Sequence, residues 1–141
     1  MNLKWYYWYF QSAIPERLCD EIVRYGKEQE KETALTGNAN FNNLSKLELK
    51  NIQKKRKSDI VWMSDRWIYK EIQPYIHQAN ESAEWNFEWD YSESCQFTEY
   101  KKGQFYDWHC DTYTEPFNEP EAPEKHSKIR KLSMTVSLTD S

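Results

Sequence analysis

Hydrophobic residues recur with helical spacing in two stretches of the chain. The first runs from Pro15, a residue favoured at the first helical position, to about Lys31. The second runs from Trp67 to Ala83, and Ser64 is placed to cap it. Pro74 lies inside this second stretch, where the missing N–H and the ring predict a kink or a break. We therefore expect two amphipathic helices.

Elsewhere the apolar period changes to two, which is typical of half-buried strands. Trp85, Phe87, Trp89 and Tyr91 alternate with polar residues. The predicted strands are Trp5–Phe10, Ile60–Met63, Trp85–Tyr91, Cys95–Tyr100, Gln104–Asp111 and Ile129–Thr139. Because helices come early and strands late, the order of elements favours an α+β fold with helices on one face of a sheet.

Three segments between these elements are polar. Residues 36–46 are rich in turn formers and predict a loop. Residues 46–57 carry six basic side chains, and either a solvated face or a polyanion-binding patch accounts for them. Thr112–Lys128 contains three prolines and several acidic residues, and loops of this length in a compact domain are often functional. We expect it to be a mobile lid over a substrate entrance.

Composition and charge narrow the class of protein. The chain has 141 residues, which predicts a single domain over 1–141, and its net charge of −4 argues against nucleic-acid binding by bulk charge. Seven Trp and ten Tyr supply large rings for a core that is poor in aliphatic residues. No apolar run approaches the length of a membrane span, and no secretory signal is visible. The three scattered cysteines, without a CxxC pair, favour a reducing cytoplasm.

The candidate chemistry lies in the predicted strand Gln104–Asp111. Side chains alternate along a strand, so His109 and Asp111 project to the same face and could bind one metal ion. An imidazole and a carboxylate, with one further His, form the facial triad of non-haem Fe(II) oxygenases. The plainer interpretation is a surface histidine beside a carboxylate. On the same regular strand, Cys110 would point away from the metal as a small buried residue, and Trp108 would form core or pocket wall.

The residues around this pair resemble a known family. Gln96 and Tyr100 share one face of the preceding strand, and Gly103 permits a tight turn before Tyr106. The pattern Gln96-x3-Tyr100-x2-Gly103-x2-Tyr106-x2-His109-x-Asp111, followed by Arg130-Lys131-Leu132-Ser133, resembles the prolyl 4-hydroxylase-like branch of the 2-oxoglutarate and Fe(II)-dependent dioxygenases, particularly its bacterial and phage hydroxylases. Similar segments precede it, namely Arg56–Trp62, Trp67, Asn80 and Trp85–Phe87.

The resemblance implies a double-stranded β-helix, or jelly roll, with buttressing N-terminal helices. It implies Fe(II) held by His109 and Asp111, and 2-oxoglutarate as cosubstrate contacted by Tyr100 and, on the same face, Gln96. Ser137 matches a position that faces the cosubstrate. No catalytic residue beyond the metal ligands is implied. The reaction would use molecular oxygen to hydroxylate an unactivated C–H bond of a prolyl, other peptidyl or small-molecule substrate, while 2-oxoglutarate becomes succinate.

The family also needs a distal His and a basic residue for the far carboxylate of 2-oxoglutarate, on later strands. His77 lies on the second predicted helix and His126 in the acidic loop, so neither matches the distal position. We therefore expect the chain to be the N-terminal part of such an enzyme, with an incomplete jelly roll and little turnover alone. Two alternatives stay open, an inactive jelly roll used for interaction and a module that stacks exposed Trp and Tyr on sugars or single-stranded bases.

Overall fold

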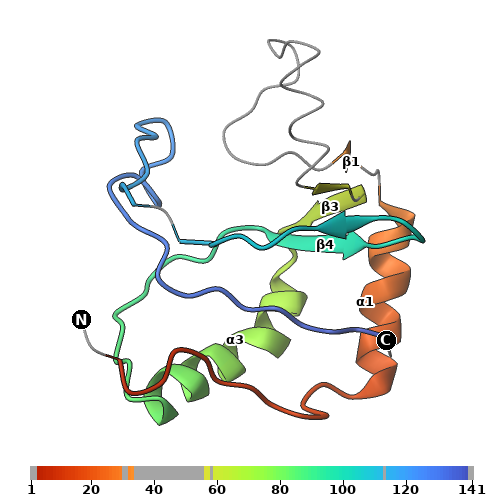
Figure 1. Ribbon diagram of the computed structural model, residues 1–141, viewed down its shortest axis with the longest axis horizontal. Helices are drawn as coiled ribbons and strands as arrows, with labels where there is room; N and C mark the ends of the chain where they lie inside the picture. Colours follow the sequence, from red (N-terminus) through yellow and green to blue (C-terminus); the bar gives the residue numbers. More distant parts are fainter. Residues whose placement is uncertain (1–2, 30–31, 34–55, 58, 113, 140–141) are drawn as a thin grey trace. The chain divides into compact units, whose positions relative to one another are not determined.

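The computed structural model describes residues 3–29, 32–33, 56–57, 59–112 and 114–139 (Figure 1). This part of the chain is α+β, with two helices and short antiparallel strands, and it shows no jelly roll. Neither described helix is long and apolar enough to cross a membrane. The predicted loop 36–46 and most of the basic stretch 46–57 lie outside the described residues.

The chain divides into two compact units, which are described separately below. Unit 1 takes its described residues from the ranges 1–24, 64–93 and 110–141, and unit 2 takes its described residues from 25–63 and 94–109. Each unit is therefore discontinuous in sequence, and neither corresponds to a continuous piece of the predicted domain 1–141.

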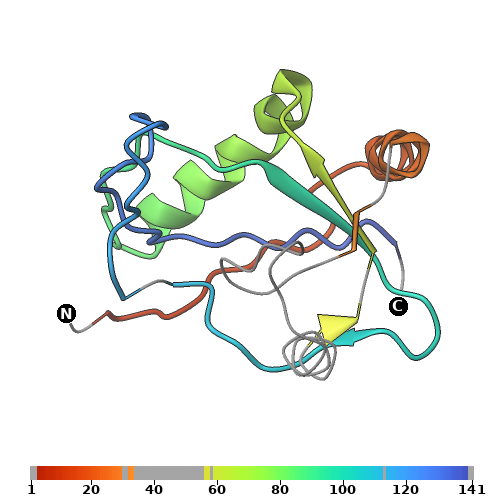
Figure 2. The same ribbon diagram turned by 90° about the horizontal axis from the view of Figure 1, so that it is seen from above.

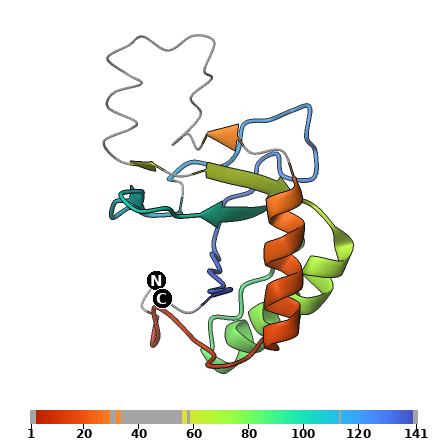
Figure 3. The ribbon, with the colours of Figure 1, turned by 90° about the vertical axis from the view of Figure 1, so that its right-hand side faces the viewer.

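Helix α1, Glu16–Glu28, begins where the sequence predicted (Figure 3). Pro15 precedes it, and the Pro15 carbonyl accepts hydrogen bonds from the backbone N–H groups of Leu18 and Cys19 at 2.8 and 3.1 Å. Since proline has no N–H to leave unpaired at a helix start, this position costs the helix nothing. The helix ends three residues before the predicted Lys31.

The strands of unit 2 form two small antiparallel sheets (Figure 2). The first sheet has the order β1-β3-β4, with β3 and β4 paired over five residues so that Trp62 lies opposite Gln96. The second pairs β2 with β5. The strand bounds are β1 Glu32–Thr33, β2 Arg56–Lys57, β3 Asp59–Met63, β4 Cys95–Glu99 and β5 Phe105–Tyr106. The predicted strands Ile60–Met63 and Cys95–Tyr100 are thus confirmed as β3 and β4.

The two faces of the β3–β4 pair differ in burial. Val61, Met63 and Phe97 on one face are at most 8 % exposed. The ring of Phe97 packs so closely on Gly26 of α1 that a Cβ atom there would lie 2.7 Å from its carbon atoms. On the opposite face, Trp62 is 53 % exposed, and Gln96, which is paired with it, is also exposed. The first face forms part of the core of unit 2. The second face is open at Trp62 and Gln96 but closed at Ile60, which is only 4 % exposed.

Helix α3, Arg66–Ser82, confirms the second helical stripe but corrects two details. Its N-cap residue is Asp65 rather than Ser64. The helix also continues through Pro74 without a break. Proline has no N–H, so the backbone carbonyl of Lys70, four residues before Pro74, has no helical hydrogen-bond donor. Lys70 and Pro74 are both exposed, so water can donate to that carbonyl instead.

Three predicted strands of unit 1 are not strands. Residues 5–10, 85–91 and 129–139 form no ladder with any described segment. The predicted alternation of burial in 85–91 is nevertheless present, because its aromatic residues are half-buried and the polar residues between them are exposed. Asn80 on α3 replaces a neighbouring strand here, since its side-chain amide donates to the Phe87 carbonyl at 2.8 Å and accepts from the Phe87 N–H at 3.0 Å. One-sided packing alone therefore produces the strand-like pattern.

The described residues of the segment 112–128, namely 112 and 114–128, form a loop, as predicted, and the loop is closed by its own hydrogen bonds. Phe117 donates to the Lys128 carbonyl, and Ser127 donates to the Phe117 carbonyl, both at 2.8 Å. Lys125 forms an ion pair with Glu119 at 2.5 Å, and this hydrogen bond raises the pKa of Lys125. The expected mobility of this loop as a lid stays a prediction.

Candidate functional site

The structure places the two candidate metal ligands outside any strand. Strand β5 ends at Tyr106, so the predicted strand Gln104–Asp111 is wrong beyond its first residues. In the described part of the chain, β5 pairs with β2 through two residues, Phe105 and Tyr106. No described residue after Tyr106 is paired with another strand. His109 belongs to unit 2 and Asp111 to unit 1, so each is described with its own neighbours.

His109 follows a bend at Trp108, beyond the end of β5, and stacks on Tyr106. The two rings lie 3.5 Å apart between centroids and are nearly parallel, with an angle of 16°. The Nδ1 atom of His109 lies 2.7 Å from the backbone carbonyl oxygen of Asp107. A carbonyl can only accept, so this contact requires a proton on Nδ1, and in the neutral ring Nε2 then carries the lone pair. Histidines that ligate metals commonly donate their other nitrogen to a carbonyl in this way.

The neighbours of His109 correct two predictions. Trp108 was expected in the core or a pocket wall, and it is 100 % exposed. Cys110 was expected to be buried, and it is exposed with a free thiol. Both predictions depended on a regular strand packed on one side, and the chain has left the sheet at this point. Because Tyr106 is the last residue of β5, the inside–outside alternation does not extend to 108 and 110.

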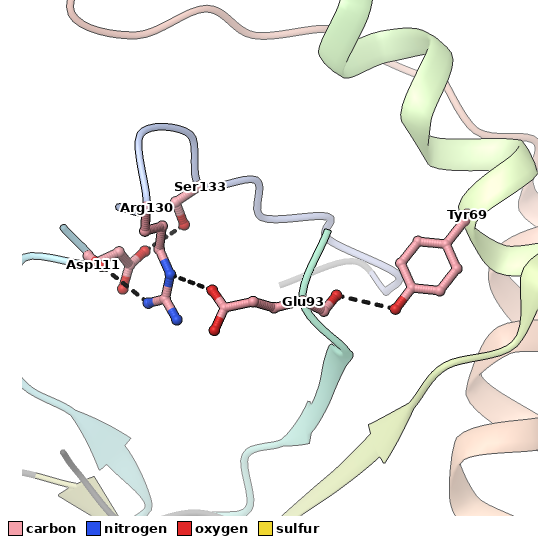
Figure 4. A network of polar contacts seen from close by, with 5 residues as sticks. All are labelled: Tyr69, Glu93, Asp111, Arg130 and Ser133. Carbon is pink, nitrogen blue, oxygen red and sulfur yellow. Dashed lines mark hydrogen bonds and ion pairs between the residues drawn. The ribbon is translucent and has the colours of Figure 1, made fainter. Parts of the chain in front are cut away.

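Asp111 lies in a network of polar contacts within unit 1 (Figure 4). The Ser133 hydroxyl donates to Oδ2 of Asp111 at 2.5 Å, and Nη1 of Arg130 donates to the Asp111 carbonyl at 3.0 Å. Nε of Arg130 contacts Oε2 of Glu93 at 2.6 Å, and the Tyr69 hydroxyl donates to the Glu93 carbonyl at 3.0 Å. Arg130 and Ser133 belong to the motif that carried the family resemblance. The contacts themselves could not be predicted, because they join residues 19 and 22 positions apart.

The predicted cosubstrate residues lie on or next to β4 in unit 2. Gln96 is exposed on the open face of the sheet, and Tyr100, just beyond the end of the strand, is 50 % exposed. Gly103 has a φ of +80° in the turn that follows, where Gln104 donates to the Lys101 carbonyl at 2.8 Å. This confirms the predicted turn, because such a φ favours glycine.

Sequence reasoning missed Trp62 as a possible site residue. It was assigned only to a strand, yet it lies opposite Gln96 in the ladder and is 53 % exposed. Paired residues of neighbouring strands project to the same face, so the indole and the Gln96 side chain extend from the same face of the sheet. The alternation in Ile60-Val61-Trp62-Met63 places Trp62 on the face opposite to the buried Val61 and Met63, but only the strand register shows that Gln96 is its neighbour.

Ser137, which the resemblance matches to a position facing the cosubstrate, is exposed in the segment 129–139.

The other two histidines make local contacts. The ring of His77 on α3 packs against Trp89, with centroids 4.6 Å apart and ring planes tilted by 35°. Nδ1 of His126 accepts a hydrogen bond from the Glu119 N–H at 3.2 Å, inside the loop 112–128. Among the described residues, no group of three His, Cys, Asp or Glu side chains could hold a metal ion. His109 and Asp111 are therefore considered as two donors, without a third from this part of the chain.

These two donors suit Fe(II) in chemical type. An imidazole nitrogen and a carboxylate oxygen are the ligands that non-haem Fe(II) sites use. One residue separates them, so their Cα atoms can be no more than about 7 Å apart along the chain. The His109 imidazole and the Asp111 carboxylate each have a hydrogen bond of the kind that orients metal ligands, from Nδ1 to Asp107 and from Ser133 to Oδ2. The residues present thus fit an iron site as two of its ligands.

The N-terminal aromatic segment, Trp5–Tyr9, is exposed rather than buried. Tyr6, Tyr7 and Tyr9 are 78, 74 and 69 % exposed, and Trp5 and Trp8 are 48 and 38 % exposed. Trp85 and Trp89, which the binding-module interpretation would place in the same exposed row, are half-buried. The segment is held at one end, where Nε1 of Trp85 donates to the Trp5 carbonyl at 2.6 Å.

No family model matches the chain, and neither does any curated protein or solved structure.

Proposed function

We propose that this chain is an Fe(II)- and 2-oxoglutarate-dependent dioxygenase that hydroxylates an unactivated C–H bond of a prolyl or other peptidyl substrate. One observation carries the proposal. His109 and Asp111, one residue apart, are each oriented by a hydrogen bond of the kind that metal ligands make. In this assignment Nε2 of His109 and the Asp111 carboxylate bind the iron. The bound iron would supply oxygen activation coupled to decarboxylation of 2-oxoglutarate.

The residues of the open β3–β4 face would receive the cosubstrate. Gln96 offers a side-chain amide and Tyr100 a phenolic hydroxyl, and both donate hydrogen bonds to carboxylates. Both side chains are exposed, so a small dicarboxylate could reach them. The neighbouring Trp62 would shield one side of that ligand from water, since its indole lies on the same face as Gln96.

A double-stranded β-helix is the fold that goes with this function. The antiparallel pairing of β3 with β4 and of β2 with β5 supports it, because a jelly roll is built from antiparallel strands.

The test is Fe(II)-dependent formation of succinate from 2-oxoglutarate in air, with the protein purified as its gene encodes it. We expect succinate above the level given by free Fe(II), and we expect a chelator to remove it. Protein that is folded by circular dichroism and gives no succinate with any of a panel of prolyl and other peptides would contradict the proposed activity.

We infer a second candidate function, binding of neutral sugar chains, from the exposed aromatic segment Trp5–Tyr9. Aromatic rings offer flat faces for stacking, and this segment presents five of them in succession. Strong binding of single-stranded nucleic acid would also need cations along the backbone path. Lys4, the basic residue that precedes these rings in the sequence, forms an ion pair with Glu84 at 3.4 Å. A neutral ligand therefore suits the segment better than a polyanion.

Affinity electrophoresis in gels that contain soluble glucan or xylan tests this second function. We expect the wild-type protein to be retarded and the combined variant Tyr6→Ala, Tyr7→Ala, Tyr9→Ala to migrate freely. Trp108→Ala is the matched control, because it removes a fully exposed aromatic side chain outside the segment. Retardation by oligo(dT) and not by the polysaccharides would show that the ligand class is wrong.

A further inference from the structure

We propose that Arg130 and Ser133 are positioning residues for the Asp111 carboxylate, an inference that rests on the proposed iron site. Ser133 holds the side chain, through its hydroxyl bond to Oδ2 at 2.5 Å. Arg130 holds the backbone, through its bond from Nη1 to the Asp111 carbonyl at 3.0 Å. One short segment thus restrains both the backbone position of Asp111 and the rotation of its carboxylate (Figure 4).

Arg130 is itself anchored by a second acceptor. Its Nε atom lies 2.6 Å from Oε2 of Glu93, and the side chains of Arg130 and Glu93 are only 26 and 34 % exposed. The guanidinium group therefore donates through two different nitrogens in a fixed planar arrangement. A lysine would keep the charge but has a single nitrogen, so it could not reproduce this geometry.

The anchor extends to helix α3. The Glu93 carbonyl accepts a hydrogen bond from the hydroxyl of Tyr69, which lies in the first turns of α3. A continuous path of hydrogen bonds thus leads from a helix, through Glu93 and Arg130, to Asp111. Asp111 needs such support because it lies in an irregular segment, where no described strand ladder holds its backbone.

This arrangement matters for a metal ligand in particular. A carboxylate that can rotate freely must be ordered when the ion binds, and the hydrogen-bond partners of ligands reduce that cost. Loss of such a partner typically weakens metal affinity by roughly 10–100-fold. The two residues act through Asp111 and need not touch the ion.

Titration of the metal-free protein with Co(II), followed by its visible absorption, tests the inference without any turnover. We expect Ser133→Ala and Arg130→Lys each to weaken Co(II) binding by roughly 10–100-fold and to change the absorption band that reports ligand geometry. Ser133→Thr keeps the hydroxyl and should bind like the wild type. Thr135→Ala is the control, because it removes an exposed hydroxyl from the same extended segment.

The outcomes separate this inference from the proposed function. If Asp111→Ala abolishes Co(II) binding while Ser133→Ala and Arg130→Lys bind like the wild type, the positioning role is overturned and the metal site stands. If the wild-type protein shows no Co(II) binding that depends on His109 and Asp111, both are overturned. Circular dichroism and urea unfolding of each variant check the fold. If Arg130→Lys does not fold, the comparison of Ser133→Ala with Ser133→Thr decides whether the positioning role holds.

Discussion

Replacing His109 by alanine is expected to abolish specific binding of Fe(II) and its substitute Co(II), and Asp111→Ala should do the same. Each substitution removes one of the two protein donors assigned to the ion. Since loss of a hydrogen-bond partner of a ligand alone costs roughly 10–100-fold, loss of the ligand itself should weaken affinity by at least about 100-fold. Isothermal titration of the metal-free protein under anaerobic conditions measures the effect. Succinate formation should be lost in parallel.

The matched control is His77→Ala. His77 is also exposed, and its ring also packs against an aromatic side chain, Trp89, although at a tilt of 35°. It therefore controls for the loss of an exposed imidazole packed against an aromatic ring without removing an assigned ligand. We expect it to bind Fe(II) like the wild type. Equal affinities in His109→Ala and the wild type would show that His109 is not a ligand and would remove the basis of the proposed function.

Gly26→Ala is expected to destabilise the protein, although alanine usually stabilises a helix relative to glycine by up to about 1 kcal/mol. The added Cβ would lie 2.7–2.9 Å from three ring carbons of Phe97, a distance that real Cβ atoms essentially never show. Phe97 is only 8 % exposed, so its ring has little room to move. Overpacking of this kind costs typically 1–3 kcal/mol, so after the helix gain the net loss in free energy of unfolding should be up to about 2 kcal/mol. Urea unfolding measures it.

A double-mutant cycle identifies the cause of this loss. In a Phe97→Leu background the smaller side chain makes room, so Gly26→Ala should cost less than in the wild type. Gly103→Ala is the control, since a Cβ atom there meets nothing within 4 Å but its φ of +80° strains alanine. Its cost, roughly 1–2 kcal/mol, should be the same in both backgrounds. An identical cost for Gly26→Ala in both backgrounds would contradict the packing explanation.

The helices and the strands β3 and β4 could be predicted because their signals are local. Pro15 and the spacing after it specify α1, and the apolar spacing from Trp67 specifies α3. The pattern in 85–91 was correctly identified as one-sided burial but wrongly as a strand. An extended segment packed on one side has the same period, and here the Asn80 side chain supplies two of the hydrogen bonds that a neighbouring strand would make.

The candidate site could be predicted only in part, for a related reason. The spacing of His109 and Asp111 identified two possible ligands, but the burial of Trp108 and Cys110 was wrong because the strand ends at Tyr106. The contact of Asp111 with Ser133 joins positions 22 residues apart, and it depends on the tertiary structure. No periodicity in the sequence reports such a contact.

The bond from the Trp85 indole to the Trp5 carbonyl has a consequence for folding during synthesis. These residues are 80 positions apart, and so are the ion-paired Lys4 and Glu84. At about 5–20 residues per second, a ribosome needs roughly 4–16 s to add the second member of each pair after the first. During that interval the start of the chain lacks both of these contacts, although Phe10 can already pack on Tyr75 once residue 75 has been made. The aromatic segment Trp5–Tyr9 of the nascent chain therefore stays without this anchor until residue 85 has been translated.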